Sequence, residues 1–180
     1  MGKTLDYNKR CSRLTKEQKI IGFLVALDFR KAFDSLEWPF IMRVLDVFNF
    51  GSRIKRWIST FYTNVESAVL NNGYMMNWFK PSKGVRQGCP LSPFLFILSA
   101  ELMSIKLHHG PGFKGINLFG NELKLSQFAD DTNLFCADLI SVERALNLLD
   151  DFGRIAGLRL SMKKTIWLES GLTIKSTPWT

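Results

Sequence analysis

The order of apolar and polar residues along the chain predicts alternating helices and strands. A continuous apolar run over 21–27 is typical of a strand buried on both faces, and Asp28 ends it. Helices are predicted over 36–48 and 52–62, because apolar residues recur there at helical spacing and Gly51 separates the two segments. The chain therefore begins its folded part with a buried strand followed by two amphipathic helices.

Turn residues divide the rest of the chain into further elements. Asn71-Asn72-Gly73, between apolar runs over 65–70 and 75–79, indicates a β-hairpin. The remaining predictions are a buried helix over 94–107 with Ser92-Pro93 as N-cap and first turn, a hairpin over 113–126, a strand pair around Asp130-Asp131, a helix over 141–156 ended by Gly157, and two short strands over 158–169. This pattern predicts one α/β (α+β) domain, in which helices cover one face of a largely antiparallel sheet.

Composition narrows the class of protein. The chain has 180 residues, of which 46% are hydrophobic and 22% charged, so we expect a globular domain. A net charge of +8 favours a polyanionic partner, with nucleic acid ahead of an acidic membrane surface. No apolar run approaches the roughly 18 residues of a membrane span, and the N-terminal stretch lacks the apolar core of a signal peptide. We therefore expect a soluble, intracellular protein.

Cysteine and histidine offer no metal-site spacing. Cys11, Cys89 and Cys136 are odd in number and far apart, so we expect free thiols. His108 and His109 are adjacent and are expected at a solvated helix end.

The candidate chemistry lies in acidic residues. Asp130-Asp131 is flanked by apolar, strand-forming residues, where two neighbouring carboxylates are costly unless a cation lies between them. With Asp28 on an adjacent central strand, three acids would hold two Mg²⁺ ions about 4 Å apart, as phosphoryl-transfer sites do. Plainer interpretations are a turn for the acid pair, a strand end or helix N-cap for Asp28, and a favourable charge before the helix from residue 36 for Asp34.

A glycine-containing segment over 84–93 is a second candidate. Its glycines would let a ligand approach the backbone closely, while Arg86 can pair with phosphate and Gln87 can hydrogen-bond a base or sugar. The alternative is an ordinary glycine-proline loop that begins the following helix, which spacing alone does not exclude.

Four segments together resemble the motifs of reverse transcriptases. They are FLVALDFRKAFD at 23–34 (motif A), GVRQGCPLSP at 84–93 (motif B), FADD at 128–131 (motif C) and AGLRLSMKKT at 156–165 (motif D). The motifs occur in family order, and their amino-acid sequences most resemble those of non-LTR (LINE-type) retrotransposon enzymes. The resemblance implies a polymerase palm over 21–169, preceded by a basic arm over 1–20 and followed by a tail over 170–180.

The resemblance also implies roles for single residues near the acids. Asp28 and Asp130 would bind both metal ions, with Asp131 and the backbone of Phe29 beside them. Lys164 would lie near the leaving pyrophosphate as a general acid, a role for which Lys163 is equally available.

Further residues would contact substrate. The backbone of Phe29, Arg30, Lys31 and Ala32 would line the incoming triphosphate. Phe33 would be the steric gate against a ribose 2′-hydroxyl, although a core aromatic is the better interpretation without the family. Arg86, Gln87 and Gly88 would contact the incoming nucleotide and the template.

The implied function is RNA-directed DNA polymerisation. The enzyme would add dNTPs to a DNA primer on an RNA template with two Mg²⁺ ions, for which Mn²⁺ can substitute. We expect a palm from a larger polyprotein with most of the fingers and thumb absent, so that it polymerises poorly or not at all by itself. Motif D has Ser161 where the family usually has Asn. The alternative is a non-catalytic nucleic-acid-binding remnant that uses the basic arm with Arg53, Lys55 and Arg56. A template-free nucleotidyltransferase or cyclase is a third interpretation, which motif B disfavours.

Overall fold

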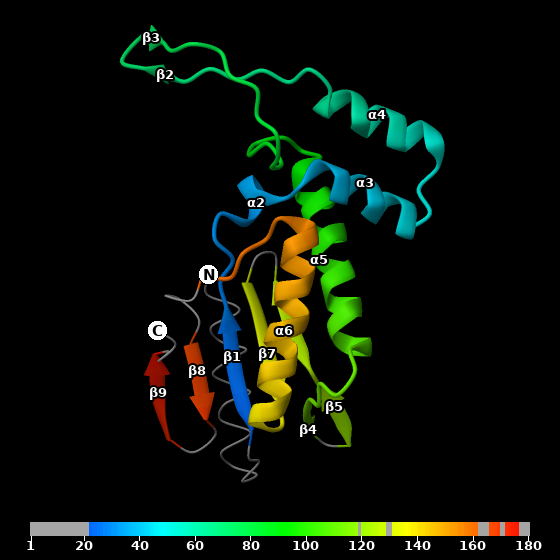
Figure 1. The fold of residues 1–180 in the computed structure, drawn as a ribbon, viewed down its shortest axis with the longest axis vertical. Coiled ribbons are helices and arrows are strands. Elements are labelled where there is room, and N and C mark those ends of the chain that lie inside the picture. Colours follow the sequence, from blue (N-terminus) through cyan, green and yellow to red (C-terminus); the bar gives the residue numbers. More distant parts are fainter. Residues whose placement is uncertain (1–21, 119, 129–130, 162–165, 170–171, 177–180) are drawn as a thin grey trace.

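A five-stranded antiparallel sheet forms the centre of the computed structural model, which describes residues 22–118, 120–128, 131–161, 166–169 and 172–176. The strands follow the order β6-β7-β1-β8-β9, so β1 lies in the middle (Figure 1). Their bounds are β1 Phe23–Leu27, β6 Leu125–Phe128, β7 Asp131–Cys136, β8 Ile166–Glu169 and β9 Leu172–Ser176. The predicted antiparallel sheet is confirmed, and strand β9 is an addition within the segment expected as a tail. The division into arm, palm and tail stays a prediction.

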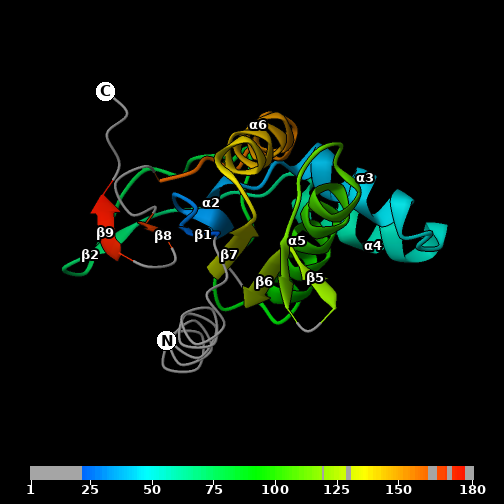
Figure 2. The same cartoon turned by 90° about the horizontal axis from the view of Figure 1, so that it is seen from below.

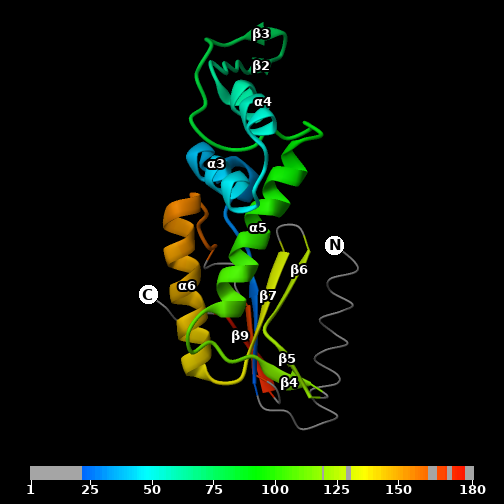
Figure 3. The ribbon, with the colours of Figure 1, turned by 90° about the vertical axis from the view of Figure 1, so that its right-hand side faces the viewer.

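Two long helices lie side by side over one face of this sheet. They are α5, Ser92–His109, and α6, Leu139–Ala156, and Figures 1 and 3 show both on the same side of β1 and β7. The main core forms between these layers, because β1 and β7 direct alternate side chains toward the helices. Its fully buried members include Val25, Leu95, Met103, Leu134 and Leu149. The prediction that helices cover one face is therefore confirmed.

A short hairpin packs on part of the sheet's other face. Strands β4, Ile116–Leu118, and β5, Asn121–Leu123, contribute Ile116 to a small cluster with Phe135 of β7. Strand β7 is therefore buried on both faces from Thr132 to Cys136. Seen from below, the central strands form a row in the order β9, β8, β1, β7 and β6, and helix α6 lies on one side of this row (Figure 2).

A second layer of elements extends beyond the end of the sheet. It comprises α2, Ala32–Ser35; α3, Trp38–Val47; α4, Ser52–Tyr62; and the hairpin strands β2, Leu70–Asn71, and β3, Tyr74–Met75. The hairpin projects away from the sheet at the top of Figure 1. Asn72 and Gly73 both have positive φ angles, of 49° and 82°, as a tight two-residue hairpin turn requires.

Two predicted helices differ in detail from the structure. The helix predicted over 36–48 begins at Trp38, because Leu36 is extended and Pro39 favours the first turn. The helix predicted over 94–107 begins at Ser92 with Leu91 as its N-cap, so the expected capping role of Ser92 is wrong. The expectation that this helix is buried on nearly every side is also wrong at its outer face, where Phe94 and Ile97 are 65% and 55% exposed.

Helix α6 begins and ends with the chemistry expected of a capped helix. The Asp138 carboxylate accepts a hydrogen bond from the backbone N–H of Ser141 at 2.6 Å, which starts the helix two residues before the predicted Ser141. Gly157 ends it in the left-handed conformation, with φ of 82°, as predicted.

Several minor expectations concern single side chains. His108 and His109 are exposed at the end of α5, and Cys89 and Cys136 are free thiols, as predicted. Cys11 lies outside the described residues. Within the described ranges, no helix combines the length and the apolar character needed to cross a membrane.

Candidate active site at the ends of β1 and β7

Two of the predicted acids lie at the same end of adjacent strands. Strands β1 and β7 pair in antiparallel register, with Phe23 opposite Cys136 and Leu27 opposite Thr132. Extending this register by one residue sets Asp28 opposite Asp131. Asp28 is half-buried and Asp131 is exposed, so a ligand from solvent can reach their carboxylates. Carboxylate oxygens are the ligands that Mg²⁺ prefers, and this pair therefore fits a divalent cation.

Asp130 lies outside the described residues, as do Lys163 and Lys164. Within the described ranges, no group of three metal-ligating side chains forms. The structure therefore brings together two acids of the predicted set, and the metal-binding roles stay predictions.

Motif D packs against motif A through backbone hydrogen bonds. The N–H of Ser161 donates to the carbonyl of Asp28 at 2.7 Å, and the N–H of Arg30 donates to the carbonyl of Arg159 at 2.8 Å. Between them, Phe29 and Leu160 form an antiparallel bridge. The backbone on either side of the candidate catalytic acid is therefore held by residues 159–161.

Motif B is joined to motif A in the same way. The N–H of Gly84 donates to the carbonyl of Leu36, and the N–H of Val85 donates to the carbonyl of Phe33, each at 2.7 Å. Gly84 has a φ of +90°, and a Cβ placed on it would lie 2.8 Å from the backbone oxygen of Asp34. Glycine is therefore required here for a close approach between two segments about fifty residues apart in sequence.

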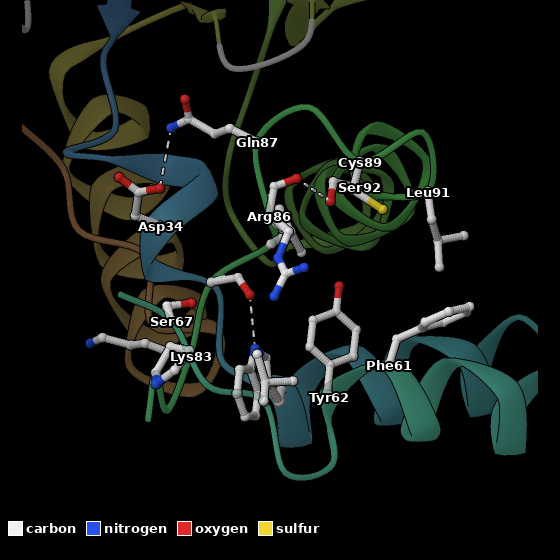
Figure 4. Close-up of a pocket in the computed structure, with 15 residues that line it drawn as sticks. Asp34, Phe61, Tyr62, Ser67, Lys83, Arg86, Gln87, Cys89, Leu91 and Ser92 are labelled. Carbon is white, nitrogen blue, oxygen red and sulfur yellow. Dashed lines mark hydrogen bonds between the residues drawn. The ribbon is translucent and has the colours of Figure 1, made fainter. Parts of the chain in front are cut away.

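A side-chain contact joins the same two motifs. The sequence favours Asp34 as a charge placed before a helix from residue 36, but Asp34 lies inside the one-turn helix α2. Its carboxylate accepts a hydrogen bond from Nε2 of Gln87 at 3.2 Å (Figure 4). Asp34 therefore lies in the first turn of α2 and not directly before a helix from residue 36, and the turn at Leu36 brings it to the motif B loop.

The residues expected to line the triphosphate follow directly after β1. Arg30 and Lys31 are exposed, whereas Ala32 is buried at the start of α2. Lys31 has a positive φ of 48°, which turns the chain sharply at this point.

Phe33 stacks on Phe96 of α5. The ring centroids lie 4.4 Å apart, with an interplanar angle of 15°, and Phe33 is half-buried. This contact fixes the ring between motif A and the helix after motif B. It is compatible both with a core aromatic and with a steric gate, so the gate stays a prediction.

A cavity of about 410 Å³ opens beside motif B (Figure 4). Its polar lining comes from motifs A and B and includes Asp34, Arg86 and Gln87. Its aromatic lining comes from the start of α3 and the end of α4 and consists of Trp38, Phe61 and Tyr62. Sequence reasoning missed this aromatic wall, because nothing in the spacing of α4 shows that its end meets the motif B loop.

Electrostatic effects in this cavity centre on Tyr62 and Cys89. Burial raises the pKa of the Tyr62 hydroxyl, and the neighbouring Cys89 adds to the increase. A hydrogen bond from the backbone of Leu91 lowers the pKa of the Cys89 thiol. The positive charge of Arg86 partly offsets the increase in the pKa of Tyr62 and adds to the decrease in the pKa of Cys89. Its guanidinium faces the Tyr62 ring across the cavity in Figure 4.

Comparison with known proteins shows similarity to reverse transcriptases and to proteins of retrotransposable elements. A family model described as "Reverse transcriptase (RNA-dependent DNA polymerase)" matches residues 3–176. The chain is 30% identical over 153 residues to "Transposon TX1 uncharacterized 149 kDa protein" of Xenopus laevis. It is 31% identical over 142 residues to "Retrovirus-related Pol polyprotein from type-2 retrotransposable element R2DM" of Drosophila melanogaster. These alignments cover 84% and 79% of this chain but only 12% and 13% of the relatives.

Solved structures resemble the fold at low sequence identity. Apo telomerase from Candida tropicalis has a TM-score of 0.68 and 13% identity, over 95% of this chain and 33% of that one. Telomerase from Candida albicans, solved with a TWJ fragment of telomeric RNA, has a TM-score of 0.66, over 96% of this chain and 31% of that one. At such low identity these matches establish the fold alone, and they agree with the predicted helices over an antiparallel sheet.

Proposed function

Because this chain belongs to the reverse transcriptase family, we propose that it forms the palm of an RNA-directed DNA polymerase whose active site lies at the ends of β1 and β7. The observation that carries the proposal is the β1–β7 register, which sets Asp28 and Asp131 at the same end of neighbouring strands. Its proposed substrates are an RNA template, a DNA primer and a dNTP.

In this proposal the acids hold the metal ions. Asp28 and Asp131, together with Asp130, which precedes Asp131 in the sequence, would bind two Mg²⁺ ions. When bound, these ions lower the pKa of a primer 3′-hydroxyl and neutralise charge on the departing pyrophosphate. The protein itself would position the reacting groups. This positioning requires that the backbone around motif A be held in place.

The chain's own residues supply that positioning. Residues 159–161 hold the backbone of Asp28 and Arg30 from one side, and Gly84 and Val85 hold the end of motif A from the other. Arg30 and Lys31 are exposed cations next to the proposed metal site, where they can face a triphosphate. The Asp34 carboxylate orients the amide of Gln87, which fixes a polar group beside the proposed nucleotide.

Primer extension tests the proposal directly. The chain would be given a primed RNA template, dNTPs and Mg²⁺, and Asp28→Asn and Asp131→Asn would each be compared with Glu101→Gln on α5, which is exposed and far along the sequence from every motif acid. We expect extension that EDTA abolishes, and a loss of at least a hundredfold in either aspartate variant but not in Glu101→Gln. Salt-sensitive RNA binding without extension would instead support the non-catalytic alternative.

The proposed gate has its own test. The variant Phe33→Val removes the ring that stacks on Phe96, and we expect it to raise incorporation of ribonucleotides relative to deoxynucleotides. Phe96→Val removes the other ring of the stack. Equal changes in the ribose preference of both variants would mean that the stack, and no specific gate at Phe33, sets the preference.

A further inference from the structure

Helix α4 presents an aromatic and basic face to solvent. Arg53, Trp57 and Phe61 follow one another at i, i+4 and i+8, so they form a continuous stripe along the helix. Arg56 lies beside this stripe, three residues after Arg53. Trp57 and Phe61 are 69% and 66% exposed, and the one buried residue of the helix, Ile58, lies outside the stripe. The two rings of the stripe therefore face mostly solvent.

Positive charge is concentrated around the same surface. Residues 52–86 contain six Lys or Arg and one acid, a net +5 out of +8 for the whole chain. The three lysines of this segment form ion pairs, namely Lys55 with Asp46, Lys80 with Glu66 and Lys83 with Glu37. In the part of the chain that the structure describes, the guanidinium groups of Arg53, Arg56 and Arg86 have no ion-pair partner. These three arginines are therefore available to an external anion.

The stripe leads into the cavity beside motif B. Phe61 belongs to both, since it ends the stripe and lines the cavity with Tyr62. Tyr62 in turn packs on Trp38 at 5.2 Å between ring centroids, and Arg86 lies across the cavity from it (Figure 4). Aromatic rings, and arginines without an ion-pair partner among the described residues, thus continue from the outer end of α4 to the loop that holds Gln87.

We propose that this surface, defined by Arg53, Arg56, Trp57 and Phe61 and ending at Arg86, binds a single-stranded nucleic acid. Bases would stack on Trp57 and Phe61, and phosphates would pair with the arginines. A single strand fits because its bases are free to stack on protein rings, whereas those of a duplex stack on one another. The inference rests on the nucleic-acid substrate of the proposed function, but it concerns a surface outside the acidic site.

Charge favours this occupant over an apolar protein surface. An apolar protein surface would leave Arg53 and Arg56 without partners, whereas a polyanion neutralises them. The adjoining β2–β3 hairpin also exposes aromatic residues, including Tyr74 and Trp78. It has no charged residue between Glu66 and Lys80, so the argument from charge does not extend to it.

Equilibrium binding of a fluorescein-labelled 12-nucleotide RNA, measured by fluorescence anisotropy, tests the proposal. The assay contains EDTA and no nucleotides, so its result does not depend on whether the chain polymerises. We expect Trp57→Ala combined with Phe61→Ala to weaken binding at least tenfold. Arg53→Gln combined with Arg56→Gln is expected to lower the slope of log K against log salt by about 0.7 for each phosphate that the variant no longer neutralises.

Matched controls lie elsewhere on the chain. Phe94→Ala removes an equally exposed ring of α5, 65% exposed, and Lys106→Gln combined with Lys114→Gln removes two charges near the other end of that helix. Both controls should bind RNA within twofold of the unsubstituted chain. Thermal melting of every variant by circular dichroism establishes that each one is folded.

Three results would overturn the proposal. The first is an affinity within twofold of the unsubstituted chain for both α4 variants. The second is equally tight binding of duplex and single-stranded RNA. The third is a change from dimer to monomer on removing Trp57 and Phe61 with RNA affinity unchanged, which would identify the surface as a contact between copies. A DNA strand of the same sequence, run in parallel, tells whether the surface prefers template-like RNA or primer-like DNA.

Discussion

Replacing Gly84 with alanine tests whether motif B is held against motif A as the structure indicates. Gly84 combines a φ of +90° with a backbone neighbour, because an added Cβ would lie 2.8 Å from the carbonyl oxygen of Asp34. Three hydrogen bonds depend on this close approach. They are Gly84 N–H to Leu36 O at 2.7 Å, Val85 N–H to Phe33 O at 2.7 Å, and Trp38 Nε1–H to Gly84 O at 2.8 Å.

The expected loss of stability has two parts. A left-handed backbone costs an L-residue about 1–2 kcal/mol relative to glycine. Moving the loop away from Asp34 also weakens the three hydrogen bonds, each with a net contribution of roughly 0.5–1.5 kcal/mol. If half of that contribution is lost, the total is about 2–4 kcal/mol, which for a domain of this size lowers Tm by roughly 5–15 °C.

Urea unfolding measures this loss, and two other glycines separate its causes. Gly88 also has a positive φ, of +82°, but a Cβ there would meet nothing within 4 Å, so Gly88→Ala should cost only the backbone part. Gly51 has an ordinary φ of −62° and the same open surroundings, so Gly51→Ala should be nearly neutral. If Gly84→Ala and Gly88→Ala lowered the free energy of unfolding equally, within about 0.5 kcal/mol, the close contact with Asp34 would be refuted.

Three further predictions concern other parts of the fold. Burial raises the pKa of the Cys136 thiol to about 12, whereas the pKa of Cys89 is lowered, so iodoacetamide at pH 8 should label Cys89 well before Cys136, as site-resolved mass spectrometry can measure. Asp138→Ala should cost about 1 kcal/mol in urea unfolding at pH 7 through loss of the α6 cap. Because the folded-state pKa of Asp138 is lowered, this stabilisation is present above its unfolded pKa and disappears as pH falls through the folded value, so the difference between the two proteins should shrink below about pH 4. Ser161→Pro, which removes the N–H that donates to Asp28, should lower both Tm and primer extension, whereas Ser161→Asn should change neither.

The parts of the fold that depend on local chemistry could be predicted from the sequence. The apolar run of β1 and the hairpin turn at Asn72-Gly73 lie where the pattern indicates, because buried strands and tight turns have strong local requirements. Helix starts are less predictable. The α6 cap at Asp138 is not predicted by the pattern, because its partner, the N–H of Ser141, belongs to a serine that is itself a preferred N-cap residue.

Of the candidate site, only the residues that belong to recognisable motifs could be predicted from the sequence. Asp28 and Asp131 are connected through the resemblance, and the register of β1 and β7 explains how they meet. The role of Asp34 could not be predicted, because its contact with Gln87 depends on a turn at Leu36 that no local signal marks. The aromatic wall at Phe61 and Tyr62 could not be predicted either. These residues line the cavity only because the end of α4 lies next to the motif B loop in the folded chain.

The way the motifs are joined explains why motif D can have Ser161 in place of the usual residue. Ser161 lies where Asn is usual in the family, which raises the question of whether motif D still supports the acid. The contact with Asp28 uses the backbone N–H of Ser161, and the flanking contact uses the backbone carbonyl of Arg159. Side-chain identity at position 161 is not needed for either bond. Motif B is anchored likewise, through the N–H groups of Gly84 and Val85. Backbone pairing on both sides therefore sets the position of the candidate acid, and this attachment tolerates sequence change wherever an N–H and the required φ are kept.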